Sequence, residues 1–209
     1  MKKALLLICV LALALGITYL ALHKSNADGE KPEDKDVPLA INSKTSAFNR
    51  SFSSVLNSYY DLSDGFAESD TSLVTKSAVQ LSISIDSIRF DQFKADSSVI
   101  LTAMNLAQSI QGEIKGLTGE KKTDQKKREF NMITDQLYSL IRTVRYDGAV
   151  VFHMRCSNAF SDSSEAYWLS PTNQVVNPYL GKNNQTGTNK MSDDGEVSDS
   201  IHFSAPVSE

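Results

Sequence analysis

The chain has 209 residues, of which 41% are hydrophobic and 22% charged, which suits one ordinary core and excludes two large ones. Its formal net charge is −4, and Lys2, Lys3 and Lys24 lie in or beside an N-terminal apolar segment, so the remainder carries −7. This balance excludes a basic duplex-binding surface, and we expect no nucleic-acid partner. The only cysteines, Cys9 and Cys156, exclude an intradomain disulfide framework and paired zinc knuckles.

The first 22 residues have the pattern of an export segment. Lys2 and Lys3 precede an apolar run from Ala4 to Leu22. This run is longer than a signal core of about 7–15 residues and close to the roughly 20 that span a bilayer. We therefore expect an uncleaved transmembrane anchor (1–22) that holds the rest of the chain outside the cytoplasmic membrane, facing the periplasm or the cell exterior. The alternative is a signal peptide cleaved after Ala27, which would release the protein into the periplasm.

The segment 23–44 is polar, charged and interrupted by Pro32 and Pro38. It has too few apolar residues to bury, so we expect a disordered linker. The remaining residues, 45–209, contain the folded part of the chain.

Helical periodicity dominates the residues up to about 146. A first apolar stripe runs from Phe48 to Leu62 and fails near Gly65, and a second segment begins around Ser69. In the second segment helix is favoured over strand, although four residues alternate as in a strand: Val79, Leu81, Ile83 and Ile85.

Two further helices are predicted, the third starting after Asp96 and ending by Gly119, and the fourth starting at Thr123. The fourth has a continuous apolar stripe from Phe130 to Val144. Four amphipathic helices with short connections predict a mainly α fold, a four-helix up-down bundle. After Tyr146 the β-branched run 149–154 predicts a strand, followed by loops, so we expect a C-terminal strand-and-loop cap (147–209).

The last third of the chain contains four short motifs in a fixed order. They are Cys156-Ser157-Asn158-Ala159, Trp168-Leu169-Ser170, Asn177-Pro178-Tyr179-Leu180-Gly181 and Met191-Ser192-Asp193-Asp194-Gly195. With the preceding helix, this order resembles a bacterial domain of unknown function, over roughly residues 48–201. That family is found alone in exported proteins and fused to the membrane-fusion subunits of copper and silver efflux pumps.

The resemblance implies a soft-metal site but also shows departures from it. The family pattern runs Cys-Pro-Met-Ala, Trp-Leu-Ser, Asn-Pro-Tyr-x-Gly and Met-Leu-x-Cys-Gly. Here Cys156 and Met191 are kept, whereas the motif methionine is Asn158 and the second cysteine is Asp194. If two cysteines and two methionines form the family's site, half of these donors are missing.

The residues themselves offer one replacement donor. Cu(I) and Ag(I) prefer thiolate and thioether sulfur. Residues two apart on a strand share a face about 6.6 Å apart, so Met154 and Cys156 could face one ion while His153 points away. The candidate metal ligands are therefore Cys156, Met191 and Met154. The alternative is that Met154 is core packing and Cys156 a small buried hydrophobe.

Other chemistry is less well supported by the sequence. A thiol nucleophile activated by His153 lacks an orienting acid and an oxyanion hole, so we do not expect an enzyme. The Trp-Leu-Ser and Asn-Pro-Tyr motifs are expected to be structural and to fold the C-terminal loop against the end of the bundle. The alternative is that they form a binding platform for a carbohydrate or a peptide. The residues concerned are Trp168, Asn177, Pro178, Tyr179 and Gly181.

The sequence thus favours a membrane-tethered extracytoplasmic binding module that handles Cu(I) or Ag(I) alongside metal-efflux or other envelope proteins. The alternative is that the metal site has been lost and the domain is an envelope scaffold or protein-interaction domain.

Overall fold

A computed structural model of the chain describes residues 41–181 and 195–203. The expected anchor 1–22 and most of the expected linker lie outside these residues. The described residues belong to one compact unit. None of the helices in the described ranges is long and apolar enough to cross a membrane.

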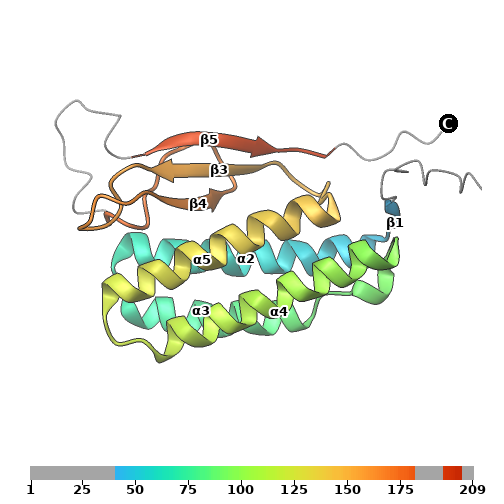
Figure 1. Cartoon of the computed structure of the whole chain (residues 1–209), viewed down its shortest axis with the longest axis horizontal. Coiled ribbons are helices and arrows are strands. Elements are labelled where there is room, and N and C mark those ends of the chain that lie inside the picture. Colours follow the sequence, from blue (N-terminus) through green and yellow to red (C-terminus); the bar gives the residue numbers. More distant parts are fainter. Residues whose placement is uncertain (1–40, 182–194, 204–209) are drawn as a thin grey trace, which may run out of the picture. The chain divides into compact units, whose positions relative to one another are not determined.

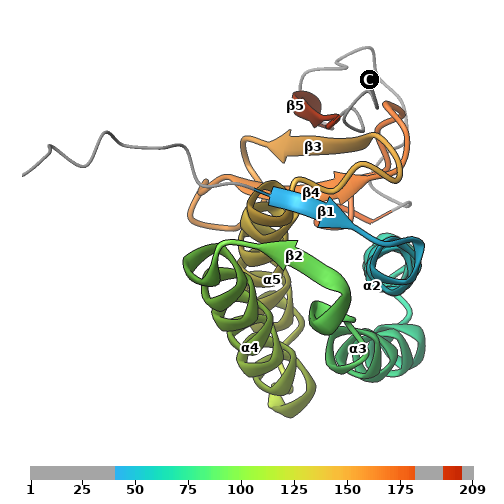
Figure 2. The ribbon, with the colours of Figure 1, turned by 90° about the vertical axis from the view of Figure 1, so that its right-hand side faces the viewer.

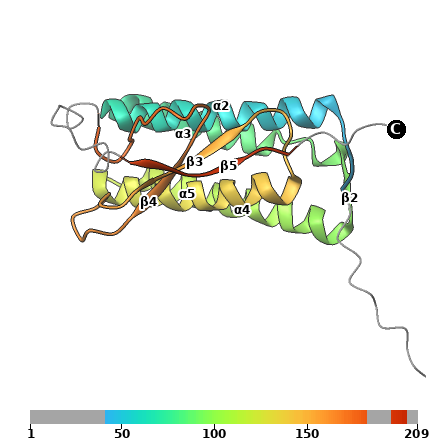
Figure 3. The same ribbon diagram turned by 90° about the horizontal axis from the view of Figure 1, so that it is seen from above.

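Four helices contain most of the described residues, so the mainly α prediction is confirmed. Successive helices run in opposite directions and lie side by side (Figures 1 and 3). Helix α2 packs against α3, α3 against α4, and α4 against α5. Stacked rings of Tyr59 and Phe130, with centroids 5.3 Å apart, join α2 to α5. The helices are α2 (Ser46–Glu68), α3 (Thr71–Asp86), α4 (Ser97–Gly119) and α5 (Thr123–Val144).

Helix α2 continues past Gly65, where the sequence predicted its end. Gly65 lies against α3, and a Cβ atom there would be 3.0 Å from the backbone nitrogen of Val74. The glycine therefore allows the two helices to approach closely, at the cost of some helix propensity. The helix ends at Glu68, and the capping residue Ser69 has a φ of 58° and donates its N–H to the carbonyl of Phe66.

The second segment, for which the sequence allowed either a helix or a strand, forms helix α3. Asp70 caps it by accepting hydrogen bonds from two backbone N–H groups of the first turn. Leu81 and Ile85 are buried in the core, whereas Val79 and Ile83 are about half exposed, at 50% and 53%. The strand-like alternation therefore comes from two apolar residues on the outer face of a helix.

The connection between α3 and α4 contains a short 3₁₀ turn, Phe90–Gln92, and strand β2 (Phe93–Ala95). Strand β2 pairs with β1 (Ile41–Lys44), which precedes α2, in a small antiparallel ribbon. Strand β1 falls within the range 23–44 that we expected to be a disordered linker. Its pairing with β2 gives these four residues a place in the folded unit.

The C-terminal region forms a three-stranded antiparallel sheet, of which the sequence predicted only one strand. The order is β4-β3-β5, with β3 (Val151–Cys156), β4 (Ala166–Ser170) and β5 (Glu196–Ile201). Strand β4 contacts α5 and α2, so the sheet lies along the side of the bundle above these helices (Figure 2). The expected cap across the bundle end is therefore corrected to a sheet along its flank.

Candidate functional site

The register of β3 and β4 determines which candidate ligands share a face. Met154 lies opposite Trp168, and Cys156 lies opposite Ala166. Residues two apart on a strand point to the same face, and the register of β3 with β4 is unbroken here, so both sulfur side chains lie on the same side of the sheet. Both are completely buried, and Cys156 is a free thiol.

The Asn-Pro-Tyr motif covers this face of the sheet. The side-chain oxygen of Asn177 accepts hydrogen bonds from the backbone N–H groups of Tyr179 at 2.8 Å and Leu180 at 3.3 Å. Pro178 and Gly181 are also buried, and Gly181 has a φ of 72°, a conformation that glycine adopts without strain. The motif is therefore a tight turn that is closed by its own asparagine.

Tyr179 connects this turn to the rest of the fold. Its hydroxyl donates to the carbonyl of Tyr167, and its own carbonyl accepts from the ammonium group of Lys127 on α5. Its ring meets Trp168 edge-on at 6.3 Å and also packs on Phe130. Burial raises the pKa of Tyr179 well above its ordinary value and lowers the pKa of Lys127.

The structure therefore brings Met154 and Cys156 together but places them beneath the motif residues. Met191 and Asp194 lie outside the described residues. Within 41–181 and 195–203, no group of three or more His, Cys, Asp or Glu residues could hold a metal ion. Any soft-metal site built on Cys156 and Met154 would thus require the Tyr179 turn to move.

His153 lies on the opposite face of β3 from Cys156. Its ring stacks between Tyr138 of α5, at 4.2 Å, and Tyr167 of β4, at 4.8 Å. Burial lowers the pKa of His153, while the carboxylate of Asp199 opposes this effect. An imidazole on the far side of the strand cannot take a proton from the Cys156 thiol, so this geometry does not form a nucleophile and base pair.

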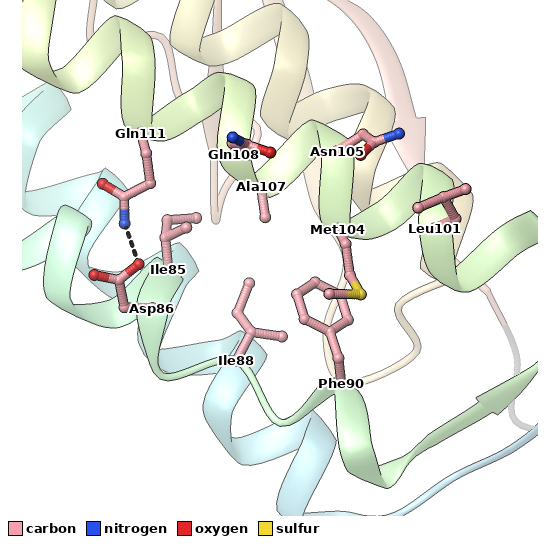
Figure 4. A pocket seen from close by; sticks show the side chains of 10 residues that line it. All are labelled: Ile85, Asp86, Ile88, Phe90, Leu101, Met104, Asn105, Ala107, Gln108 and Gln111. Atoms are coloured by element: carbon pink, nitrogen blue, oxygen red, sulfur yellow. Dashed lines mark hydrogen bonds between the residues drawn. The ribbon is translucent and has the colours of Figure 1, made fainter. Parts of the chain in front are cut away.

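A different feature, a groove between α3 and α4, is open to solvent (Figure 4). It has a volume of about 360 Å³, and its lining combines apolar residues with Asp86 and three amides, Asn105, Gln108 and Gln111. Ile85, Ile88 and Ala107 are buried in it, whereas Leu101 and Met104 on α4 are 59% and 49% exposed. Its apolar lining consists of Ile85, Ile88, Phe90, Leu101, Met104 and Ala107.

One end of the groove is fixed by a hydrogen-bonded amide. The Gln111 side-chain nitrogen donates to the Asp86 carboxylate at 2.8 Å and to the carbonyl of Ser82 at 2.7 Å. The Ser82 hydroxyl donates back to the Gln111 oxygen at 2.6 Å. These bonds hold α3 and α4 at a defined separation beside the groove (Figure 4).

Sequence reasoning missed this groove, although a signal was present. Leu101 and Met104 are apolar residues left outside the α4 stripe that packs into the core. No charged residue occurs from Ser97 to Gly112, and α3 contains only two, Lys76 and the Asp86 at the end of the groove. A solvent-facing helix pair with so few charges differs from an ordinary protein surface.

Residues 55–147 match the model of a family described as "Protein of unknown function (DUF3347)". The match covers most of α2 and all of α3, α4 and α5, and it ends before the Cys156, Trp168 and Asn177 motifs. The chain is therefore similar, over its helices, to a domain of unknown function. Neither the curated proteins nor the solved structures include a match.

Proposed function

We propose that this chain is a non-catalytic protein-interaction domain of the cell envelope, tethered to the membrane by residues 1–22 and exposed outside the cytoplasm. The observation that carries the proposal is the open groove between α3 and α4, whose α4 side carries no charged residue from Ser97 to Gly112. Its partners belong to the envelope, including the metal-efflux proteins that the family resemblance implies.

The exposed groove residues support an interaction role in physical terms. Leu101 and Met104 have about half of their surface in water, which is unfavourable unless a partner covers them. Val79 and Ile83 are further exposed apolar residues on α3. An exposed apolar area rimmed by polar residues is typical of a protein-binding surface.

The proposal is tested by photocrosslinking in native membranes. A photoreactive amino acid replaces Asn105, which is exposed at the groove, or Asn57, which is exposed on α2, in the full chain. We expect the position 105 variant to form a discrete adduct that the position 57 variant does not form, and both to fractionate with membranes. Equal adduct patterns at the two positions, or none at either, would contradict an interaction role for this face.

A second candidate function is soft-metal binding, which is favoured by one observation. Met154 and Cys156 share a face of β3, so their sulfur atoms are placed to approach one ion if the covering turn moves. The chain's only tryptophan, Trp168, lies opposite Met154 and would report such binding. Ag(I) that changes Trp168 fluorescence in the wild type but not in Cys156→Ser would support this candidate, whereas identical responses would contradict it.

A further inference from the structure

We infer that the α3–α4 groove binds the same face of a second copy of this chain, in a twofold dimer. The inference rests on the proposed interaction role of this face and names its partner. It is based on three properties of the described residues: the groove is lined by projecting apolar side chains, its α4 side is uncharged, and its exposed amides can pair with themselves.

The first property is that the face contains both a hollow and the side chains suited to fill one. Leu101 and Met104 are three residues apart, so they are neighbours on one side of α4, and both line the groove. Around a twofold axis, the projecting side chains of one copy enter the groove of the other, and the contact is made twice. A face with only a hollow would instead require a different partner.

The second property is the distribution of charge. Outside the N-terminal segment the chain carries −7, so two copies repel each other over most of their surfaces. A charged residue close to a twofold axis also meets the same charge on its partner, which costs free energy. The stretch from Ser97 to Gly112 has no charge, so it can approach its own copy without this cost.

The third property concerns hydrogen bonding. Asn105 and Gln108 are exposed beside the groove, and an amide carries both donors and an acceptor. Each amide can therefore pair with the same residue of a symmetry-related copy, which a carboxylate or an ammonium group cannot do. The exposed amides at the groove are thus of the kind that a symmetric interface can use, and the one carboxylate in the lining, Asp86, accepts a hydrogen bond from Gln111 of the same chain.

The chain offers a matched pair of variants for the test. Met104 on α4 is 49% exposed at the groove, and Met132 on α5 is 46% exposed elsewhere. Glutamate is a good helix former, so Met104→Glu and Met132→Glu are both compatible with the fold. Sedimentation of the full chain in detergent micelles is compared for the wild type and the two variants, with circular dichroism as the check on folding.

We expect dimers for the wild type and Met132→Glu, and a rise of about 100-fold in the dissociation constant for Met104→Glu, because two carboxylates would be buried against each other. A wild type that stays monomeric up to about 100 µM, or a dimer equally weakened by both substitutions, would overturn the inference.

Crosslinking at position 105 separates this inference from the proposed function. An adduct of twice the chain mass supports the second copy. An adduct with a different protein retains the interaction role and overturns the dimer. The absence of any adduct specific to position 105 overturns both.

Discussion

Tyr59 on α2 and Thr134 on α5 are joined by a hydrogen bond of 2.6 Å between their hydroxyl oxygens. Thr134 donates its own proton to the carbonyl of Phe130 at 3.0 Å, and Tyr59 accepts the backbone N–H of Leu169 at 3.1 Å. Tyr59 is therefore the donor to Thr134. Burial raises the pKa of Tyr59 far above its ordinary value, so the hydroxyl keeps its proton. This chain of bonds ties two helices to β4 inside the core.

Removing this hydroxyl should destabilise the fold. Tyr59→Phe leaves the N–H of Leu169 unpaired in the interior, and we expect a loss of about 1–3 kcal/mol in the free energy of unfolding. Tyr60→Phe is the control, since the Tyr60 hydroxyl makes no hydrogen bond to a described residue, and it should change stability by less than about 0.5 kcal/mol. Urea unfolding of the chain from Asp28 onwards measures both, and equal losses would show that the network is unimportant.

The core role of α5 gives a second prediction. Leu137 is completely buried, so Leu137→Ala should cost about 2–5 kcal/mol through lost apolar burial and the cavity left behind. Met132→Ala on the same helix removes a half-exposed side chain and should cost less than about 1 kcal/mol. The same urea experiment applies. A loss below about half a kcal/mol for Leu137→Ala would remove this residue from the core.

His153 should make stability depend on pH. Burial lowers its pKa in the folded state below 6.5, while the unfolded chain keeps the ordinary value. As pH falls below about 6.5, the unfolded state binds a proton that the folded state does not, so the free energy of unfolding decreases until the lowered pKa is reached. His153→Phe should remove this slope, whereas substitution of the exposed His202 by Gln should keep it. Thermal unfolding between about pH 5 and 8 measures the effect, and an unchanged slope in His153→Phe would contradict the assignment.

The helices were predictable because burial imposes a period on their sequences. In α5 the apolar residues of the stripe from Phe130 to Val144 lie on one side of the helix, and that side is buried. In α3 the same analysis was ambiguous because Val79 and Ile83 are apolar for a reason other than the core of this chain. Apolar residues that lie outside the core-facing stripe, such as Val79 and Ile83, were the sequence signal of an apolar surface.

The sheet was harder to predict than the helices. Strand β5 is mostly exposed and polar, reading Glu-Val-Ser-Asp-Ser-Ile, so it lacks the alternation that marks a half-buried strand. The position of β5 in the sheet is determined by its pairing with β3, a segment that lies far from it in the sequence. The shared face of Met154 and Cys156 was predicted from the strand period, and their burial in the core was the alternative that the sequence left open.

The family motif leads to a fourth prediction, on metal affinity. If the motif marks a metal site, Asn158→Met together with Asp194→Cys should raise Cu(I) affinity, because both substitutions restore soft donors. Cys156→Ser should cancel most of this gain, since a thiolate neutralises the charge of the ion and a thioether does not.

Asn158 is exposed, so its substitution should not disturb the core, whereas Asp194 lies outside the described residues. Competition with a chromogenic Cu(I) chelator under reducing conditions measures the affinity. Unchanged affinity in a folded protein with free thiols would exclude the motif as a metal site.

The most direct test of the interaction face is an NMR concentration series on the full chain in detergent with ¹³C-labelled methionine methyl groups. Met104 lies at the groove, Met132 is equally exposed on α5, and Met154 is buried, so one sample contains the probe and two internal controls. We predict that the Met104 methyl signal shifts as concentration rises while the signals of Met132 and Met154 stay fixed. A Met104 signal that does not change, or one that changes no more than that of Met132, would contradict the proposal that this face is where copies of the chain meet.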